Sequence, residues 1–331
     1  MRTQRRLNIH LAIAVFTMLL FTTQGIPCWG AEDPARFPSR PISFIIPWEP
    51  GGTADLSGRR VADLASKVLG QPVVVENKMG GSGITGVSSV LGATPDGYTI
   101  GLTTYSTITI LPHLREVPFK VKEDFTWIMQ YAQFSNVVAA LAKSPWKTWK
   151  DFLEDARKNP GKFKYSPPGP MTAQHILLEA IFAKEKVKAT FVPVRGGEEA
   201  NRNLLGGHID LAASASIWPH IKAGTVRGLM TTQMEERMKA FPDIPTQYEL
   251  DYKIDSPNFV GLIGPKGIDQ QILRKISEGF KKAWEDHSFH EFLATMNMIP
   301  TYKDSNSFRE LVQKNFESQG KILKELNLLK K

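Results

Sequence analysis

The sequence predicts an α/β protein of two lobes, each with a mainly parallel sheet flanked by helices. Short apolar runs rich in β-branched residues alternate with longer segments whose apolar positions recur at helical spacing, which is the pattern of repeated βαβ units. A strand followed by a proline- and glycine-rich loop and a helix occurs in both halves of the chain. At 331 residues, the chain is long enough for two such lobes.

Ten apolar segments have the length and composition of strands. Their expected ranges are 42–48, 73–76, 99–103, 127–131, 137–141, 163–166, 189–194, 209–213, 226–231 and 259–263. Four segments have apolar residues at i, i+3 and i+4 and are expected to be packing helices, over 54–69, 172–184, 268–284 and 308–328. Ligands of largely parallel sheets bind outside the carboxyl ends of the strands, so the loops after these strands are the candidates for a site.

The first thirty residues are expected to be a secretory signal peptide. Arg2, Arg5 and Arg6 precede an almost wholly apolar run over 11–21. This run is shorter than the roughly 20 residues that a transmembrane helix needs. Small residues place the expected cleavage after Gly30.

Cys28, the only cysteine, lies in this leader. The mature chain is therefore expected to contain no disulfide, no catalytic thiol and no cysteine-bound metal centre. A lipid anchor on Cys28 stays open as an alternative, although Pro27 is a poor residue at such a processing site.

The charge of the chain argues against a nucleic-acid partner. The leader holds three of the 41 basic residues and none of the 33 acidic ones, which leaves 38 against 33 and a net charge of +5. The two signs are intermixed, and no basic stripe of the kind that follows a phosphate backbone is present. A small anionic ligand suits this modest positive balance.

The loop after the first predicted strand is the strongest candidate for a binding site. Pro50, Gly51 and Gly52 lead from the strand to a helix start with Thr53 and Asp55. Free backbone N–H groups and the helix dipole favour an anion at such a start. The alternative is a tight turn in which Thr53 is only the N-cap of the helix.

Two further loops add to this candidate. The strand 163–166 runs into residues 167–172, again ahead of an apolar helix. If each loop lies at the edge of one lobe, the two loops can face each other across a cleft that closes by a hinge. After the strand 189–194, Arg195 offers a guanidinium that can bind a carboxylate through two hydrogen bonds, although a solvated arginine at a turn fits the same pattern.

Seven blocks along the chain resemble, in order, the receptor family of tripartite tricarboxylate transporters, the TctC or Bug proteins. They are FPSRPISFIIPWEPGGTAD from Phe37, LGQPVVVENKMGGSGITG from Leu69, PDGYTIGL from Pro95, FVPVRGGEEANRNLLGGHIDL from Phe191, PHIKAG from Pro219, RMKAFPDIPT from Arg237 and FVGLIGPKG from Phe259. The resemblance implies a monomeric periplasmic binding protein of the Venus flytrap fold. Such a protein captures a small carboxylated solute and delivers it to a membrane permease, with no catalysis, cofactor or metal.

The resemblance also implies domains and site residues. Residues 31–141 and 259–331 would form domain 1, which anchors the carboxylate, and residues 142–258 would form domain 2, which sets selectivity. Domain 1 would bind the solute through Pro50, Gly51, Gly52, Thr53, Tyr105, Ser106 and Thr107. Domain 2 would contribute Gly169, Met171, Thr172, Gln174, His175, Val194, Arg195, Gly196 and Ser214.

Two departures from the family pattern bear on the solute. Ser214 stands where members that bind amino acids tend to carry Asp, and Val194 and Arg195 stand where a Tyr-Lys pair is common. Without that Asp an ammonium group lacks its partner, so we expect a di- or tricarboxylate or an aromatic acid without an α-amino group. The apolar side chains of Val194, Met171 and Pro170 leave room for its carbon frame, aromatic or aliphatic.

Glu49 is an unexpected residue beside the first loop. The family usually has a small or neutral residue there, and a second carboxylate would repel a bound anion. We therefore expect Glu49 to face solvent or to pair with a Lys or Arg.

The alternative function is that of a secreted α/β enzyme. Residues 81–86 match G-x-G-x-x-G and suggest a dinucleotide site. However, Asn77 to Gly80 separate this motif from its strand, and the next strand ends in Thr104 and Tyr105, where a ribose-binding acid is required. A glycine turn that lets a helix pack closely on the sheet explains the same residues.

Overall fold

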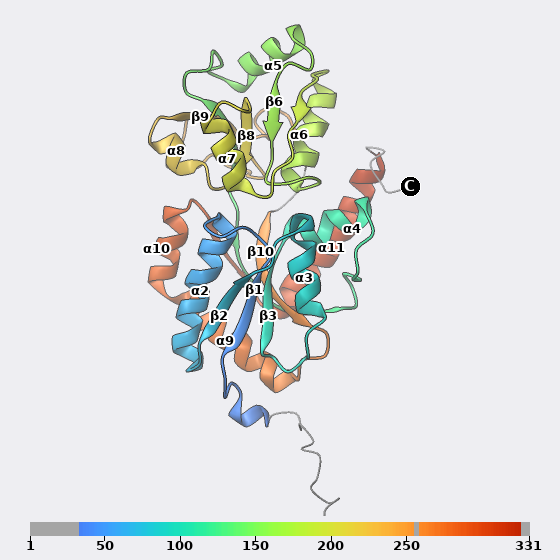
Figure 1. Ribbon diagram of the computed structural model, residues 1–331, viewed down its shortest axis with the longest axis vertical. Coiled ribbons are helices and arrows are strands. Elements are labelled where there is room, and N and C mark those ends of the chain that lie inside the picture. The colour runs from blue at the N-terminus through green and yellow to red at the C-terminus, as the bar shows by residue number, and fades with distance from the viewer. Residues whose placement is uncertain (1–32, 255–257, 326–331) are drawn as a thin grey trace, which may run out of the picture. The chain divides into compact units, whose positions relative to one another are not determined.

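The structure is a computed structural model that describes residues 33–254 and 258–325. The predicted signal peptide and Cys28 lie outside the described residues. Residues Pro34–Arg36 form a short 3₁₀ turn (η1). From Pro38 on, the described chain forms two sheets flanked by helices (Figure 1), and this confirms the predicted fold class.

Lobe 1 is built on a six-stranded sheet in the order β11-β4-β10-β3-β1-β2. Its strands are β1 (Ile42–Ile46), β2 (Val73–Asn77), β3 (Thr99–Thr104), β4 (Phe125–Gln133), β10 (Phe259–Pro265) and β11 (Ile299–Lys303). Its helical segments are α2 (Thr53–Leu69), η2 (Gly81–Gly83), α3 (Ile84–Leu91), η3 (Ser106–Ile110), α4 (Leu111–Leu114), α9 (Gln270–Glu285), α10 (His287–Thr295) and α11 (Ser305–Glu325).

Lobe 2 is built on a five-stranded sheet in the order β7-β6-β8-β5-β9. Its strands are β5 (Asn136–Leu141), β6 (Lys164–Ser166), β7 (Thr190–Phe191), β8 (Leu211–Ser214) and β9 (Val226–Thr232). Its helices are α5 (Trp149–Lys158), α6 (Ala173–Lys184), α7 (Gly197–Leu205) and α8 (Trp218–Lys222).

The sheets are mixed, whereas the sequence predicts mainly parallel ones. In lobe 1, β1 pairs in parallel with β2 and β3, but β10 is antiparallel to β3 and β4, and β11 is antiparallel to β4. In lobe 2, β5 is antiparallel to both of its neighbours. The physical reason is the crossing of the chain: β5 and β10 enter their sheets from the other lobe and therefore run against the strands that point toward it.

The crossing from lobe 1 to lobe 2 lies at residues 134–135, between β4 and β5. The boundary predicted after residue 141 therefore assigns β5 to the wrong sheet, because β5 pairs with β8 and β9. The boundary was misplaced because β4 and β5 are two apolar runs separated by only a few residues. Nothing in the sequence shows that the chain changes from one sheet to the other between them. The chain is back in lobe 1 at Phe259, where β10 begins.

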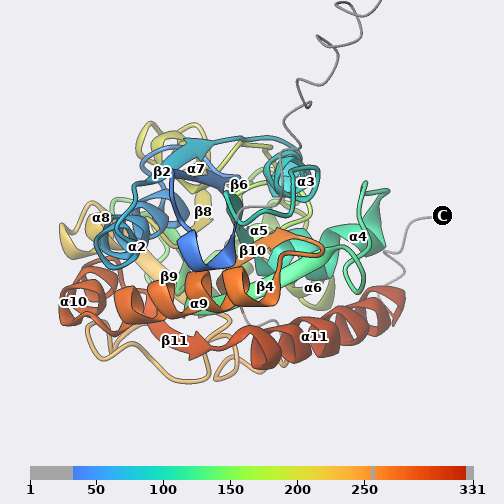
Figure 2. The same cartoon turned by 90° about the horizontal axis from the view of Figure 1, so that it is seen from below.

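Helices cover both faces of the lobe 1 sheet because the side chains of β1 alternate in direction. On one face, the ring of Phe44 lies 6.2 Å from that of Phe280 on α9. On the other face, Ile45 belongs to a buried cluster with Val90 of α3 and Phe308 of α11. Figures 1 and 2 show the pair α2 and α9 against one face and α3 and α11 against the other.

The glycine motif over 81–86 serves this packing. Gly86 lies in α3 against the end of β1, and a Cβ atom there would lie 2.6 Å from Cβ of Pro47 and 2.8 Å from the carbonyl oxygen of Lys78. The glycine-turn explanation given by the sequence therefore accounts for the motif.

We expect Gly86→Ala to lower the free energy of unfolding by about 1–3 kcal/mol, the range for overpacking a close contact. Gly92→Ala is the matched control, because the nearest atom to a Cβ at this other end of α3 is 3.4 Å away, and we expect a change within about 0.5 kcal/mol. Urea denaturation of both variants measures the difference. Equal losses would contradict the role assigned to Gly86.

Candidate functional site

An interlobe cavity lies where strand ends of the two lobes meet. The pairings direct β1 to β4 toward lobe 2 and β6 to β9 toward lobe 1, so the carboxyl ends of β1, β3, β6 and β8 face one another. Residues at and after the ends of these strands line a cavity that is open to solvent. This is the place where α/β sheets bind their ligands.

Seven of the residues proposed from the sequence line the interlobe cavity. They are Gly52, Thr53, Ser106, Thr172, Gln174, Gly196 and Ser214. The loops before α2 and α6 thus border one cavity, from opposite lobes.

The other proposed residues lie elsewhere. Val194 and Arg195 line a second cavity with the glycine turn of η2. Tyr105 is fully buried and packs its ring edge-on against Phe259, 5.3 Å between centroids. The Thr107 hydroxyl donates to the carbonyl of Ser82. Pro50, Gly51, Gly169, Met171 and His175 likewise do not line the interlobe cavity.

His175 stabilises the loop before α6 rather than the cavity wall. Its Nδ1 accepts a hydrogen bond from the backbone N–H of Met171 at 2.9 Å, and its ring stacks on Phe191 at 4.1 Å. Burial lowers the pKa of His175 against the opposing effect of Glu179. The imidazole is therefore held neutral, with Nδ1 free to accept.

Sequence reasoning missed eleven residues that line the interlobe cavity: Trp48, Glu49, Ala54, Thr104, Phe134, Asn136, Pro168, Gly197, Ala215, Ser216 and Asn258. Some of these residues are neighbours in the sequence of residues that were proposed. Including a few more residues on either side of each loop would have found Trp48, Ala54, Thr104 and Gly197. Phe134, Asn136 and Asn258 lie beside the two crossings between the lobes, and no local sequence pattern marks those crossings.

The start of α2 is open toward the cavity. Its N-cap is Gly52, which has no side chain to cap the first turn. Thr53 is therefore the first helical residue and not the cap. Its side chain is buried, and its Oγ1 has no hydrogen-bond partner among the described residues. Since the first N–H groups of a helix have no acceptor within it, this corner of the cavity offers several unpaired donors.

Trp48 adds another donor at this corner. Its indole Nε1 is buried and has no hydrogen-bond partner among the described residues, and the side chain lines both cavities. Buried donors without partners are rare in folded proteins. Together with Thr53, Trp48 therefore indicates that an acceptor group binds here.

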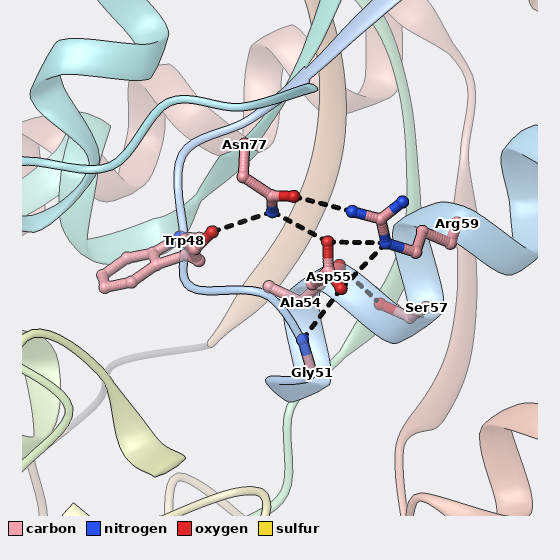
Figure 3. Close-up of polar contacts among 7 residues, drawn as sticks. All are labelled: Trp48, Gly51, Ala54, Asp55, Ser57, Arg59 and Asn77. Atoms are coloured by element: carbon pink, nitrogen blue, oxygen red, sulfur yellow. Dashed lines mark hydrogen bonds and ion pairs between the residues drawn. The ribbon is translucent and has the colours of Figure 1, made fainter. Parts of the chain in front are cut away.

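The carboxylate of Asp55 holds this loop in place (Figure 3). It accepts hydrogen bonds from the N–H of Gly51 at 2.9 Å and from Nδ2 of Asn77 at 2.8 Å. Both of its oxygens also accept from Nε of Arg59, at 3.0 and 2.9 Å. Asn77 in turn donates to the carbonyl of Trp48 at 3.0 Å, so one network fixes the loop at both ends.

Asp55 stays ionised in this environment. Burial by itself raises the pKa of a carboxyl, but the hydrogen bonds from Arg59, Asn77 and Gly51 outweigh it, and the pKa of Asp55 lies below its ordinary value. The guanidinium of Arg59 balances the charge that Asp55 places in the first turn of α2.

The start of α6 is already satisfied. The hydroxyl of Thr172 accepts from the N–H of His175 at 3.4 Å, and Ser106 of lobe 1 accepts from the N–H of Ala173 at 2.9 Å. Ala173 and Ile176 also join the buried apolar cluster of lobe 1. The first turn of α6 is thus a contact between the lobes.

The prediction for Glu49 is wrong. The sequence led us to expect that Glu49 faces solvent or pairs with a Lys or Arg, but its carboxylate binds a backbone N–H group of lobe 2. Its Oε1 accepts a hydrogen bond from the backbone N–H of Glu198 at the start of α7, at 2.7 Å. Burial raises the pKa of Glu49, opposed by this hydrogen bond and by the positive charge of Arg202. The carboxylate reaches from lobe 1 into the first turn of a lobe 2 helix.

The described residues that line the interlobe cavity include no Lys, Arg or His. Backbone N–H groups, hydroxyls, amides and the indole of Trp48 are therefore its hydrogen-bond donors. In the described ranges, no three His, Cys, Asp or Glu residues gather into a possible metal site. None of the helices in these ranges has the length and apolar character to cross a bilayer.

Comparison with known proteins identifies relatives of the whole chain. A family model for the tripartite tricarboxylate transporter family receptor, TctC, matches residues 58–328. A UPF0065 protein of Cupriavidus necator is 35% identical over 308 residues, 92% of this chain and 94% of the relative.

Solved structures share the fold. A structure described as a periplasmic transporter is 31% identical with a TM-score of 0.84, covering 88% of this chain and 99% of the other. The periplasmic binding protein BugD is 25% identical with a TM-score of 0.84, covering 89% of this chain and all of BugD.

We expect Asp55→Asn to lower the free energy of unfolding by about 1–3 kcal/mol at pH 7, because hydrogen bonds to a buried charged group are lost. Asp63→Asn on the same helix is the control: the Asp63 side chain is 54% exposed against 2% for Asp55. Its ion pairs should be worth less than about 1 kcal/mol.

The difference in the free energy of unfolding between wild type and Asp55→Asn should depend on pH. The pKa of Asp55 is lowered in the folded chain, so its stabilisation is complete above the unfolded pKa of about 3.9 and is lost as the pH falls through the folded pKa. The gap between wild type and Asp55→Asn should therefore narrow below about pH 4. A gap that is constant with pH would contradict the assignment.

Proposed function

The chain belongs to the TctC family of tripartite tricarboxylate transporter receptors, and from this premise we propose that it captures a small carboxylated solute in the interlobe cavity for delivery to a membrane permease. The observation that carries the proposal is the open start of α2. Thr53 lines the cavity with a hydroxyl that has no hydrogen-bond partner among the described residues, and it stands in the first turn of α2, behind a glycine N-cap. A carboxylate is the group that such a helix start favours.

The rest of the cavity wall suits a carbon frame with neutral polar groups. Trp48, Phe134 and Pro168 supply apolar surface, and Asn136, Gln174, Ser214, Ser216 and Asn258 supply amides and hydroxyls. Ser214 brings no charge to partner an ammonium group, and the one carboxylate among the described lining residues, that of Glu49, already accepts from the N–H of Glu198. We therefore propose an aliphatic or aromatic acid without an α-amino group.

The cellular role that we propose follows the family. The chain would be exported, lose its leader near Gly30 and work in the periplasm as a monomer. The permease would recognise the receptor after the solute has brought the lobes together, since closure changes the surface that both lobes present.

Thermal unfolding of the chain from Ala31 onward tests this function. The panel holds mono-, di- and tricarboxylic acids, aromatic acids, acidic amino acids and NAD. A bound ligand at 100 times its dissociation constant stabilises by about 2.7 kcal/mol, and we expect stabilisation only by acids without an amino group. Stabilisation by NAD alone, or chemical conversion of a bound acid, would contradict the receptor function.

Calorimetry of Thr53→Val tests the binding position. We expect the best acid of the panel to bind more weakly by about 1–3 kcal/mol, the range for a hydrogen bond to a charged group. Thr103→Val is the matched control, since its hydroxyl is also buried without a partner among the described residues but does not line the cavity. Unchanged affinity in Thr53→Val would remove Thr53 from the site.

A further inference from the structure

Helices α2, α6 and α7 all begin at the wall of the interlobe cavity, but they differ in what occupies their first turns. The N-cap of α2 is Gly52, which has no side chain, and the Thr53 hydroxyl beside it has no hydrogen-bond partner among the described residues. The start of α6 is occupied by Thr172 and Ser106. The start of α7 is occupied by a carboxylate, that of Glu49, which comes from the other lobe.

The start of α7 is shaped to hold this carboxylate. Glu198 donates its N–H to Oε1 of Glu49 at 2.7 Å. Gly196, the N-cap, has no side chain in the way, and a Cβ atom there would lie 2.6 Å from Cδ of Glu49. Gly197 is equally confined, because a Cβ atom there would lie 2.6 Å from the hydroxyl of Ser214. Gly196 thus lets Glu49 approach the backbone, and Gly197 leaves room for Ser214.

We infer that Glu49 fills the anion-binding start of α7 and thereby restricts the solute to a single carboxylate, held at α2, with a neutral end toward lobe 2. This inference rests on the proposed function and names the substrate class of that same site.

The charges around the cavity support this restriction. A second carboxylate on the solute would meet the carboxylate of Glu49, and the N–H of Glu198 that could bind it is already paired. Among the described lining residues, no Lys, Arg or His offers a countercharge. Amides and hydroxyls such as those of Gln174, Asn136 and Ser214 remain for a neutral group.

The selectivity of the receptor tests the inference. The probes are acids of matched length with one or two carboxylates: hexanoate against adipate, and benzoate against terephthalate. We expect the wild type to prefer the monocarboxylate of each pair by at least tenfold, and Glu49→Ala, which vacates the start of α7, to reduce this preference by at least tenfold. Glu49→Gln, which keeps the size but removes the charge, should fall between them.

The control variant is Glu123→Gln, which removes one negative charge on the exposed surface of lobe 1. Its preference should equal that of the wild type. A wild type that prefers dicarboxylates, or an unchanged preference in Glu49→Ala, would overturn the inference while leaving the carboxylate receptor function intact.

Amide hydrogen exchange decides the occupancy of α7 without any solute. In the ligand-free wild type, the N–H of Glu198 should exchange at least tenfold more slowly than in Glu49→Ala, while amides in the middle of α7 are unchanged. Equal exchange in the two proteins would overturn the inference. If no acid of either pair binds, the receptor function fails, and this measurement still decides whether Glu49 occupies the helix start.

Discussion

The carboxylate of Asp55 is the interaction on which the rest of the site depends. It lies in the first turn of α2 and accepts hydrogen bonds from Gly51, Asn77 and Arg59. By binding the loop to its own helix, it fixes the path of the backbone and leaves the start of α2 open to the cavity. Arg59 neutralises its charge, so an anion can still bind nearby. This ion pair, in which Asp55 is buried and Arg59 is exposed, serves geometry first and stability second.

The two lobes differ in what occupies the starts of the helices that border the cavity. Side chains of lobe 1, Ser106 and Glu49, occupy the starts of α6 and α7 in lobe 2, whereas the start of α2 in lobe 1 has a glycine N-cap and a Thr53 hydroxyl without a partner among the described residues. Lobe 2 therefore contributes shape, amides and hydroxyls to the cavity. Contacts between polar groups can form and break as the lobes move, because each has water as an alternative partner. Such contacts suit the opening and closing of the lobes that the proposed function requires.

Much of the fold could be predicted from the sequence because strands and helices follow local periodicity. All ten predicted strands are present, and β11 was missed because it is a partly exposed edge strand that contains Pro300.

The family and its role as a receptor are confirmed, and the enzyme alternative is wrong. The hydrogen bond of Glu49 at the start of α7 could not be predicted, because its partner Glu198 is 149 residues away in the sequence. Arg195 was proposed for the ligand site but lines the second cavity. The direction of a side chain just after a strand depends on the turn that follows the strand, and this cannot be derived from the sequence pattern.

The central claim is that the solute carboxylate binds at the start of α2. A crystal structure of the chain grown with the acid that stabilises it most tests this directly. We expect a carboxylate oxygen within hydrogen-bonding distance of Thr53 Oγ1 and of a first-turn N–H of α2, with Glu49 still on Glu198. A carboxylate bound instead to Arg195 in the second cavity, or one that displaces Glu49 from α7, would contradict the account.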